Sequence, residues 1–434
     1  MSRLIPPHGG KGLVDRRLTG EARQAELARA ATLPQLPLTD QEKGDLIMLG
    51  IGGFSPLTGF MTRADWEGVV ERMLLADGTF WPVPVLLSVG EDDAAGVGPG
   101  ASVALVHRGT VYATMEVTER FSLAEADLRR EAELVYKGAG PDSAGDNFWR
   151  IAPEEHPGVK LLLSRRPVCL AGPITLLSEG DYPTRFPGVY LRPAETRALF
   201  TERGWSDVAA LQLRNPMHRS HEYLCKIAVE VCDGVIIHSL IGNVKAGDIP
   251  ADVRIRCIDA VVKNYFVDAN VVQGGYPLDM RYAGPREALL HAAFRQNYGV
   301  SRMIVGRDHA GVGDFYDMFE AQEIFERMPY ADGVSPRPGQ ALLCRPLKFD
   351  WTFYCRKCDG MASLRTCPHT KADRVILSGT KLRKILSEGG DVPEHFGRPE
   401  ALEILRAYYA GLEEKVAIKL HGAATGAAFE RGTP

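Results

Sequence analysis

The sequence predicts an α/β protein in which a β-rich N-terminal part precedes a parallel sheet covered by helices, with a small unit at the end. Three observations support this fold class. Between residues 207 and 306, apolar runs of strand length alternate with amphipathic runs of helix length. Before residue 167, short β-type runs alternate with turn residues instead. After residue 345, three cysteines lie close together.

The length and composition agree with several domains of an ordinary globular protein. A chain of 434 residues is too long for one domain, and the changes of pattern divide it into 1–170, 171–345 and 346–434. The net charge of -4 argues against a nucleic-acid-binding protein, and no apolar run is long enough for a membrane helix. The N-terminus lacks the apolar core of a signal peptide, so we expect a cytoplasmic protein.

Three segments of the first unit are typical of strands. They are residues 81–89 (WPVPVLLSV), 101–107 (ASVALVH) and 110–121 (TVYATMEVTERF). The glycine- and aspartate-rich stretch 90–100 separates the first from the second. This unit is therefore predicted to be a β domain of its own.

The second unit alternates strands and helices. The predicted strands are 208–213, 234–242, 271–276 and 301–306, and the predicted helices are 218–232, 252–266 and 285–299. Such alternation predicts a parallel sheet with helices on its faces. Ligands of these sheets bind outside the carboxyl ends of the strands, so the residues that follow each strand are the candidates for a site.

The strongest candidate stretch follows the first strand of this unit. Gln212 and Arg214 lie at the strand end, and Asn215 begins the turn into the helix. His218 and His221 are three residues apart and share one face of the first helical turn, where free N–H groups favour an anion. The combination predicts a pocket for phosphate or sulfate; the alternative is that these residues only cap the helix.

A second cluster follows the strand at 301–306. Arg307, Asp308 and His309 project at the same sheet edge, and neighbouring glycines allow close backbone approach. An ordinary ion pair between Arg307 and Asp308 is the alternative. Gly284 lies just before the helix predicted at 285–299. The N-terminus of that helix either faces an anion or follows a plain turn.

A fourth stretch, LSGTKLRKIL at residues 377–386, contains Ser378, Thr380, Lys381 and Arg383. It is either a phosphate-contacting loop or the start of a helix, and we favour the helix start.

Two absent motifs narrow the chemistry. No G-x-x-x-x-G-K-[ST] occurs, which excludes a P-loop kinase or ATPase, and no G-x-G-x-x-G follows the first strand of the sheet, which argues against NAD chemistry. An H-x-x-H at a strand-to-helix turn is typical of nucleotidyl transferases. There the imidazoles stabilise charge that develops at an α-phosphorus and its leaving pyrophosphate.

The cysteine cluster predicts a structural zinc site. Cys355 and Cys358 have knuckle spacing, and Cys367 and His369 follow within the same short stretch. Four protein ligands would close the coordination sphere and would hold a small, loop-rich unit together. Free thiols near the surface are the alternative.

Two motifs resemble signatures of a known family. QLRNPMHRSH and VGRDHAG are similar to those of the ATP sulfurylase (sulfate adenylyltransferase) family, and PPHGG, GGFSPLTGFM, GDIPADVRI, MRYAGPREALLHA and SGTKLRKIL extend the resemblance over most of the chain. The resemblance implies a PUA-like N-terminal domain, a Rossmann-like catalytic domain and a small C-terminal domain. No Walker A motif is present, so a fused adenylylsulfate kinase domain is not implied.

The same resemblance implies a reaction and its participants. ATP, accompanied by Mg²⁺, and sulfate would give adenosine 5'-phosphosulfate and pyrophosphate, by in-line attack of sulfate on the α-phosphate. The implied roles are sulfate binding by Gln212, Arg214 and the Ala310 backbone; phosphate contacts by His218 and His221; transition-state stabilisation by Asn215 and Arg307; and nucleotide binding by Gly284, Asp308 and His309. A homo-oligomer is implied, and we expect a homodimer.

Two other interpretations remain. A nucleotidyl transferase with a phosphopantetheine- or nicotinamide-type acceptor would share the histidines, but it leaves Gln212 and Arg214 unexplained. An RNA-binding protein built from a PUA-like domain and a zinc knuckle would lack catalysis; the acidic charge balance counts against it. The direction of the reaction depends on pyrophosphate removal and metabolite levels, not on these residues.

Overall fold

The structure is a computed structural model that describes residues 3–137, 155–243, 248–334, 336–376, 379–390, 392 and 395–412. The helices are α1 (Gly20–Ala30), α2 (Asp40–Gly50), α3 (Arg63–Arg72), α4 (Glu125–Glu131), α5 (Pro157–Leu163), α6 (Tyr182–Arg185), α7 (Pro193–Glu202), α8 (Arg219–Val231), α9 (Ala251–Tyr265), α10 (Gly284–Asn297), α11 (Glu320–Arg327), α12 (Gly379–Ser387) and α13 (Pro399–Ala410). Within the described ranges, no helix has the length and hydropathy needed to cross a membrane.

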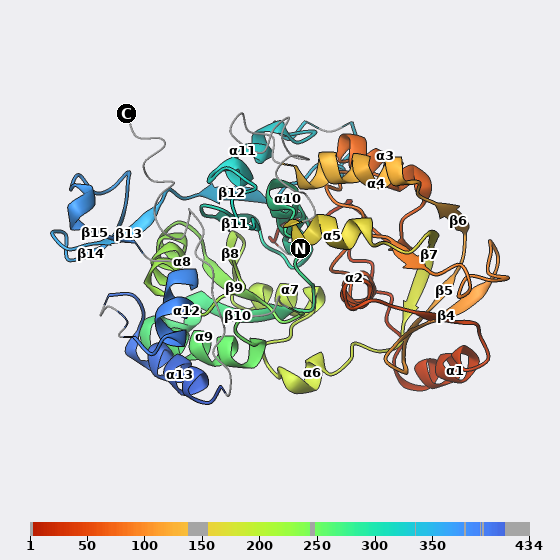
Figure 1. Ribbon diagram of the computed structural model, residues 1–434, viewed down its shortest axis with the longest axis horizontal. Helices are drawn as coiled ribbons and strands as arrows, with labels where there is room; N and C mark the ends of the chain where they lie inside the picture. Colours follow the sequence, from red (N-terminus) through yellow and green to blue (C-terminus); the bar gives the residue numbers. More distant parts are fainter. Residues whose placement is uncertain are drawn as a thin grey trace.

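The strands form three sheets. They are β1 (Gln35–Pro37), β2 (Gly59–Phe60), β3 (Leu87–Val89), β4 (Ser102–His107), β5 (Thr110–Glu116), β6 (Glu119–Ser122), β7 (Val168–Leu176), β8 (Val208–Leu213), β9 (Gly234–Leu240), β10 (Val271–Tyr276), β11 (Arg302–Val305), β12 (Arg345–Lys348), β13 (Thr352–Cys355), β14 (Gly360–Ser363) and β15 (Arg374–Ile376). Figure 1 shows the β1–β7 unit on the right, the β8–β12 sheet in the middle and the β13–β15 hairpin projecting at the far left.

The N-terminal sheet is organised around β7. Its order is β1-β4-β5-β7-β2, and β3 and β6 also pair with β7. The domain boundary predicted at residue 170 falls inside this strand, so the sheet extends to Leu176. The strand predicted at 81–89 is shorter than expected and covers only β3, because Pro82 and Pro84 cannot donate to a ladder.

The helices α1 to α5 of this unit were not anticipated from the sequence. In α2 and α3 the N-cap threonines accept from the backbone three residues on, and the acidic residues there reach back, Glu42 to Thr39 N at 2.8 Å and Asp65 to Thr62 N at 3.3 Å. These are capping boxes, and their T-x-x-[ED] pattern is the signal that could have revealed both helices.

The central sheet confirms the predicted alternation of strands and helices. Its order is β10-β9-β8-β11-β12, and every pair is parallel. One face packs against α8 and α9, and the other against α7, α10 and α11. The chain runs from β8 outward through β9 and β10 on one side, then returns to place β11 and β12 on the other. A crevice between β8 and β11 therefore opens at their carboxyl ends.

The range 346–434 implied a separate C-terminal domain. In the structure, most of the described part of this range packs against the central sheet and its helices instead. β12 begins at Arg345 and is the edge strand of the central sheet. Apolar side chains of α12 and α13, such as Leu382 and Leu405, share a core with α8 and α9. Only β13–β15 has a small cluster of its own, made of Phe353, Cys355, Ala362 and Cys367.

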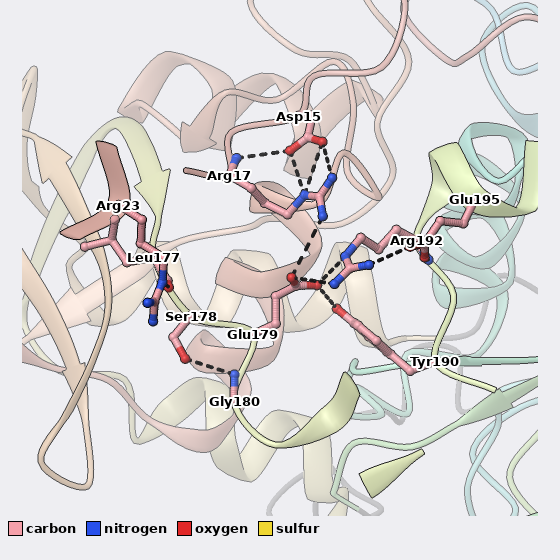
Figure 2. Close-up of polar contacts among 10 residues, drawn as sticks. All are labelled: Asp15, Arg17, Arg23, Leu177, Ser178, Glu179, Gly180, Tyr190, Arg192 and Glu195. Atoms are coloured by element: carbon pink, nitrogen blue, oxygen red, sulfur yellow. Dashed lines mark hydrogen bonds and ion pairs between the residues drawn. The ribbon is translucent and has the colours of Figure 1, made fainter. Parts of the chain in front are cut away.

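A polar network joins the N-terminal sheet to the unit built on β8–β12 (Figure 2). Glu179, in the linker after β7, accepts from Arg192 Nε at 2.8 Å, from Arg192 Nη2 at 2.9 Å and from the Tyr190 hydroxyl at 2.6 Å. Arg17, paired with Asp15, lies 4.0 Å from the same carboxylate. Deeper in the interface, Arg281 Nη2 donates to both oxygens of Asp45 of α2. The two units are thus held in a fixed orientation.

Candidate active site

Arg214 links the two strands that flank the crevice. Its Nη2 donates to the Gly311 carbonyl at 3.2 Å, and its guanidinium lies 5.2 Å from the centre of the Tyr282 ring. The Nη1 atom is buried and has no hydrogen-bond partner among the described residues. A buried cationic donor without a partner is costly unless an anion completes it, so this atom points to an anion site.

Gln212 lies beside Arg214 at the same edge. Its Nε2 donates to the Tyr276 hydroxyl at 3.2 Å and lies 3.8 Å from Met280 Sδ, so it spans from β8 toward the end of β10. Asn215 follows in the turn before α8 and is half-buried. The three residues predicted from the strand end are therefore adjacent at the crevice.

The two histidines share one face, as their spacing predicted. His218 is the N-cap of α8, His221 lies in its first turn, and their rings stack with centroids 3.8 Å apart. Burial lowers the pKa of His221 to about 4, and the nearby Arg307 adds to that shift. Burial, His221 and Arg307 also lower the pKa of His218. Both imidazoles are therefore neutral donors or acceptors at neutral pH, and the arginines carry the positive charge.

Arg307 stands on the opposite side of the crevice, in the loop after β11. Its guanidinium lies 4.3 Å from the centre of the Trp351 ring. Burial lowers its pKa to about 10, and Asp308 opposes that shift, so Arg307 stays charged at neutral pH. Asp308 and Ala310 both have left-handed backbone, with φ of 49° and 58°, a conformation that costs energy in residues other than glycine. Strain of this kind is common where a loop is shaped for a ligand.

Gly284 joins the site through the backbone. Its N–H donates to the Ala310 carbonyl at 3.2 Å, so this donor is used inside the protein. A Cβ at Gly284 would lie 2.7 Å from the Tyr316 ring, which explains why no side chain fits there. Its role toward a nucleotide stays a prediction.

The fourth predicted stretch is a helix start, as favoured. Within it, Arg383 of α12 forms an ion pair with Asp248 and ties the helix to the segment before α9. Lys381 is exposed. Ser378 and the side chain of Thr380 lie outside the described residues.

The sequence analysis missed a buried row of interacting side chains that begins at His309. His309 Nε2 lies 3.1 Å from Nδ1 of His291, and Nε2 of His291 lies 3.5 Å from Glu287 Oε1. Glu287 in turn accepts from the backbone of Arg281 at 2.9 Å and of Ala283 at 3.0 Å. His291 is not among the site residues predicted from the sequence. The available signal was the four-residue spacing of Glu287 and His291, which places them on one face of a helix.

The predicted metal ligands converge. Ligand atoms of Cys355, Cys358, Cys367 and His369 all lie within 4.8 Å of one another. His369 Nδ1 is 3.3, 3.2 and 3.6 Å from the three sulfurs in that order, and the Cys358 and Cys367 sulfurs are 3.7 Å apart. A tetrahedron with Zn–S of about 2.3 Å and Zn–N of about 2.0 Å has edges of this size.

Buried histidines make the protein sensitive to acid. Burial is the largest cause of a lowered pKa in His8, His156, His218, His221, His238, His291 and His309. Their folded pKa lies below the unfolded value, so their neutral forms stabilise the fold fully above about pH 6.5. That stability is lost as the pH falls below about 6.5, by up to about 1.4 kcal/mol per pH unit for each group.

We therefore expect the urea midpoint to fall steeply between pH 7 and pH 5. His238 supplies a matched test, because its ring lies among Tyr276, Phe294 and Tyr298 and neither nitrogen has a hydrogen-bond partner in the described part of the chain. His238→Leu should reduce the slope of unfolding free energy against pH by one proton. A midpoint that stays constant from pH 7.5 to pH 5 would show that these groups titrate normally.

Comparison with known proteins agrees with this architecture. A family model for ATP-sulfurylase matches residues 187–408, and one for a PUA-like domain matches residues 5–179. The chain is 65% identical over 428 residues to a sulfate adenylyltransferase of Desulfatibacillum aliphaticivorans, covering 98% of this chain and 100% of that protein. It is 63% identical to that of Desulfovibrio desulfuricans, covering 98% and 99%.

A solved structure shares the fold over most of this chain. The hexameric APS kinase from Thiobacillus denitrificans aligns with a TM-score of 0.69 and 25% identity, over 93% of this chain and 68% of that one. With a catalytic-family match over more than half of its length and whole-length relatives of high identity, the chain belongs to the ATP sulfurylase family.

Proposed function

We propose that this protein transfers the adenylyl group of ATP to sulfate, giving adenosine 5'-phosphosulfate and pyrophosphate, and that it catalyses the reverse reaction as well. The relatives named above are sulfate adenylyltransferases. The structural observation that carries the proposal is the unpartnered, buried Nη1 of Arg214 at the crevice between β8 and β11. The neutral pair His218 and His221 lies on the same edge.

The chemistry suits these residues. Sulfate is fully ionised at neutral pH, so it needs no general base to attack phosphorus. The barrier arises because one anion must approach another. Arg214 follows β8 and Arg307 follows β11, the two strands beside the crevice, and fixed positive charge in a dry site lowers that barrier more than it would in water. Alignment of a sulfate oxygen with the α-phosphorus supplies the rest.

We assign the individual roles as follows. Sulfate is held by Gln212, Arg214 and the Ala310 N–H; Asn215 and Arg307 stabilise the α-phosphoryl transition state; His218 and His221 donate to the phosphates and the leaving pyrophosphate; Asp308, His309 and Gly284 lie beside the nucleotide. Because both imidazoles are neutral, each offers one N–H to phosphate oxygens. Mg²⁺ enters with ATP as part of the substrate.

We propose that Zn²⁺ occupies the Cys355, Cys358, Cys367 and His369 site. The distances fit a tetrahedron, and the four side chains fill it, which is the pattern of a structural ion. The ion would hold β13–β15, which has a core of only a few buried residues. Trp351 lies directly before β13, and its ring packs against the Arg307 guanidinium. The hairpin therefore borders the candidate active site.

We further propose a cytoplasmic homodimer. The eight cysteines form no disulfide, as expected in a reducing compartment. Light scattering on the purified protein should give about twice 47.5 kDa; six copies, as in the hexameric Thiobacillus denitrificans protein, would contradict the dimer.

Sulfate-dependent pyrophosphate release from Mg-ATP tests the function. We expect release with sulfate and none with the acceptors of the alternative transferases, phosphopantetheine or nicotinamide mononucleotide. Release that requires one of those acceptors and ignores sulfate would favour the other transferase class.

A further inference from the structure

Arg254 lies at the active-site edge without an assigned role. It belongs to the first turn of α9, the helix that follows β9, and β9 is the direct neighbour of β8 in the sheet. Helices that follow strands of a parallel sheet begin at its carboxyl edge. The Arg254 side chain therefore starts from the same edge as Arg214, one strand away, and it is only 1% exposed.

The Arg254 guanidinium forms no close ion pair among the described residues. Its Nε donates to the Ile249 carbonyl at 2.9 Å, but its buried Nη2 has no hydrogen-bond partner among the described residues. Two carboxylates are close in sequence, and both are engaged elsewhere: Asp248 pairs with Arg383, and Asp252 pairs with Arg185. A buried cation left in this state is costly, and an incoming anion would remove the cost.

Electrostatics place Arg254 within the field of the same pocket. Burial is the main cause that lowers its pKa to about 10; Asp248, Tyr276 and Asp252 oppose the shift, and Arg214 adds to it. Tyr276 is also the partner of Gln212. Arg214 and Arg254 thus each have an unpartnered buried nitrogen among the described residues, and Tyr276 interacts with both Arg254 and Gln212.

We propose that Arg254 is a second cationic ligand of the tetrahedral oxyanion substrate and that it completes the Gln212–Arg214 pocket. Two positive charges balance the two negative charges of sulfate, and so they favour a dianion over a monoanion of the same shape. This inference rests on the proposed function, since the ligand is taken to be the sulfate acceptor. The other source of the same chemistry is a phosphate of ATP.

Steady-state kinetics of Arg254→Met separate the two sources. Methionine keeps much of the buried volume while removing the charge. We expect the KM for sulfate to rise by roughly 10- to 100-fold, as for loss of a charge-assisted hydrogen bond, with the KM for ATP changed less than about two-fold. The matched control is Arg256→Met, which removes the same charge from an exposed position of the same helix and should leave both constants unchanged.

A charge-specific readout distinguishes binding from a merely structural role. Perchlorate has the shape of sulfate and one negative charge, so its inhibition constant against sulfate should change less in Arg254→Met than the KM for sulfate does. Arg254→Lys, which keeps the charge, should recover part of the loss. If Arg254→Met does not fold, the Arg254→Lys variant carries the same comparison of sulfate with ATP.

Two results would overturn the inference. One is a raised KM for ATP with an unchanged KM for sulfate, which would assign Arg254 to the polyphosphate. The other is an active variant with both constants unchanged.

Calorimetric titration of sulfate into ATP-free protein keeps the test separate from the proposed reaction. Binding to wild type and Arg256→Met that is lost in Arg254→Met supports the inference even if no turnover is found; equal binding to all three contradicts it.

Discussion

Arg214→Ala is expected to abolish sulfate-dependent turnover while leaving the fold intact. The substitution removes the main countercharge to sulfate from a dry site, so kcat/KM should fall by about 10³-fold or more. Stability should change little, because Arg214 makes one hydrogen bond, to the Gly311 carbonyl, and leaves no carboxylate unpaired when it is removed. Pyrophosphate release assays and a thermal unfolding curve measure the two effects.

Arg302→Ala is the control for this experiment. Arg302 lies at the amino end of β11, so it is at the edge of the sheet opposite to the strand ends that carry the site. Its only described ion pair is with half-exposed Asp207. Exposed pairs contribute about 0–1 kcal/mol, so activity and stability should stay close to wild type. Near-normal activity of Arg214→Ala would mean that the anion pocket is misassigned.

Loss of the metal should have the largest effect on stability. The β13–β15 hairpin has three strands of three or four residues and a cluster of four buried side chains, too little to fold alone. Structural zinc in small units supplies an apparent free energy of about 10 kcal/mol. Chelation or Cys355→Ser should therefore unfold the hairpin and lower the melting temperature.

The readout can be made local to the hairpin. Trp351 precedes β13 and is 1% exposed, so its fluorescence should shift when the hairpin unfolds. The molecules that remain folded should keep most of their specific activity even though the melting temperature falls. The reason is that none of the predicted active-site residues is a predicted metal ligand. Cys232→Ser, at the C-cap of α8 and outside the four predicted ligands, is the matched control. If metal analysis finds no zinc in freshly purified protein, the proposed zinc site is contradicted.

The sequence was most informative where strands are buried on both faces. The predicted ranges 208–213 and 271–276 coincide with β8 and β10, because parallel central strands are apolar throughout and end at polar turns. By contrast, α2 is buried along most of its length and so has no polar face to reveal a helical period. Its capping box was the only local signal.

The site was predicted in part for a similar reason. Residues next to one another in sequence, such as Arg214 and the histidine pair, could be placed because the strand end and the helix start fix their position. The contacts of His309 with His291, and of Arg307 with Trp351, join segments far apart in the chain. Their geometry depends on how loops and helices pack, which no local pattern encodes. Arg254 was overlooked because a lone arginine on a helix is normally solvated.

The reverse reaction tests the central claim most directly. Forming a phosphosulfate anhydride is uphill, so ATP synthesis from adenosine 5'-phosphosulfate and pyrophosphate runs downhill and gives a strong signal even from a slow enzyme. We predict rapid ATP formation that requires both substrates and Mg²⁺ and is lost in Arg214→Ala. Folded wild-type protein that forms no ATP from this pair would contradict adenylyl transfer to sulfate as its activity.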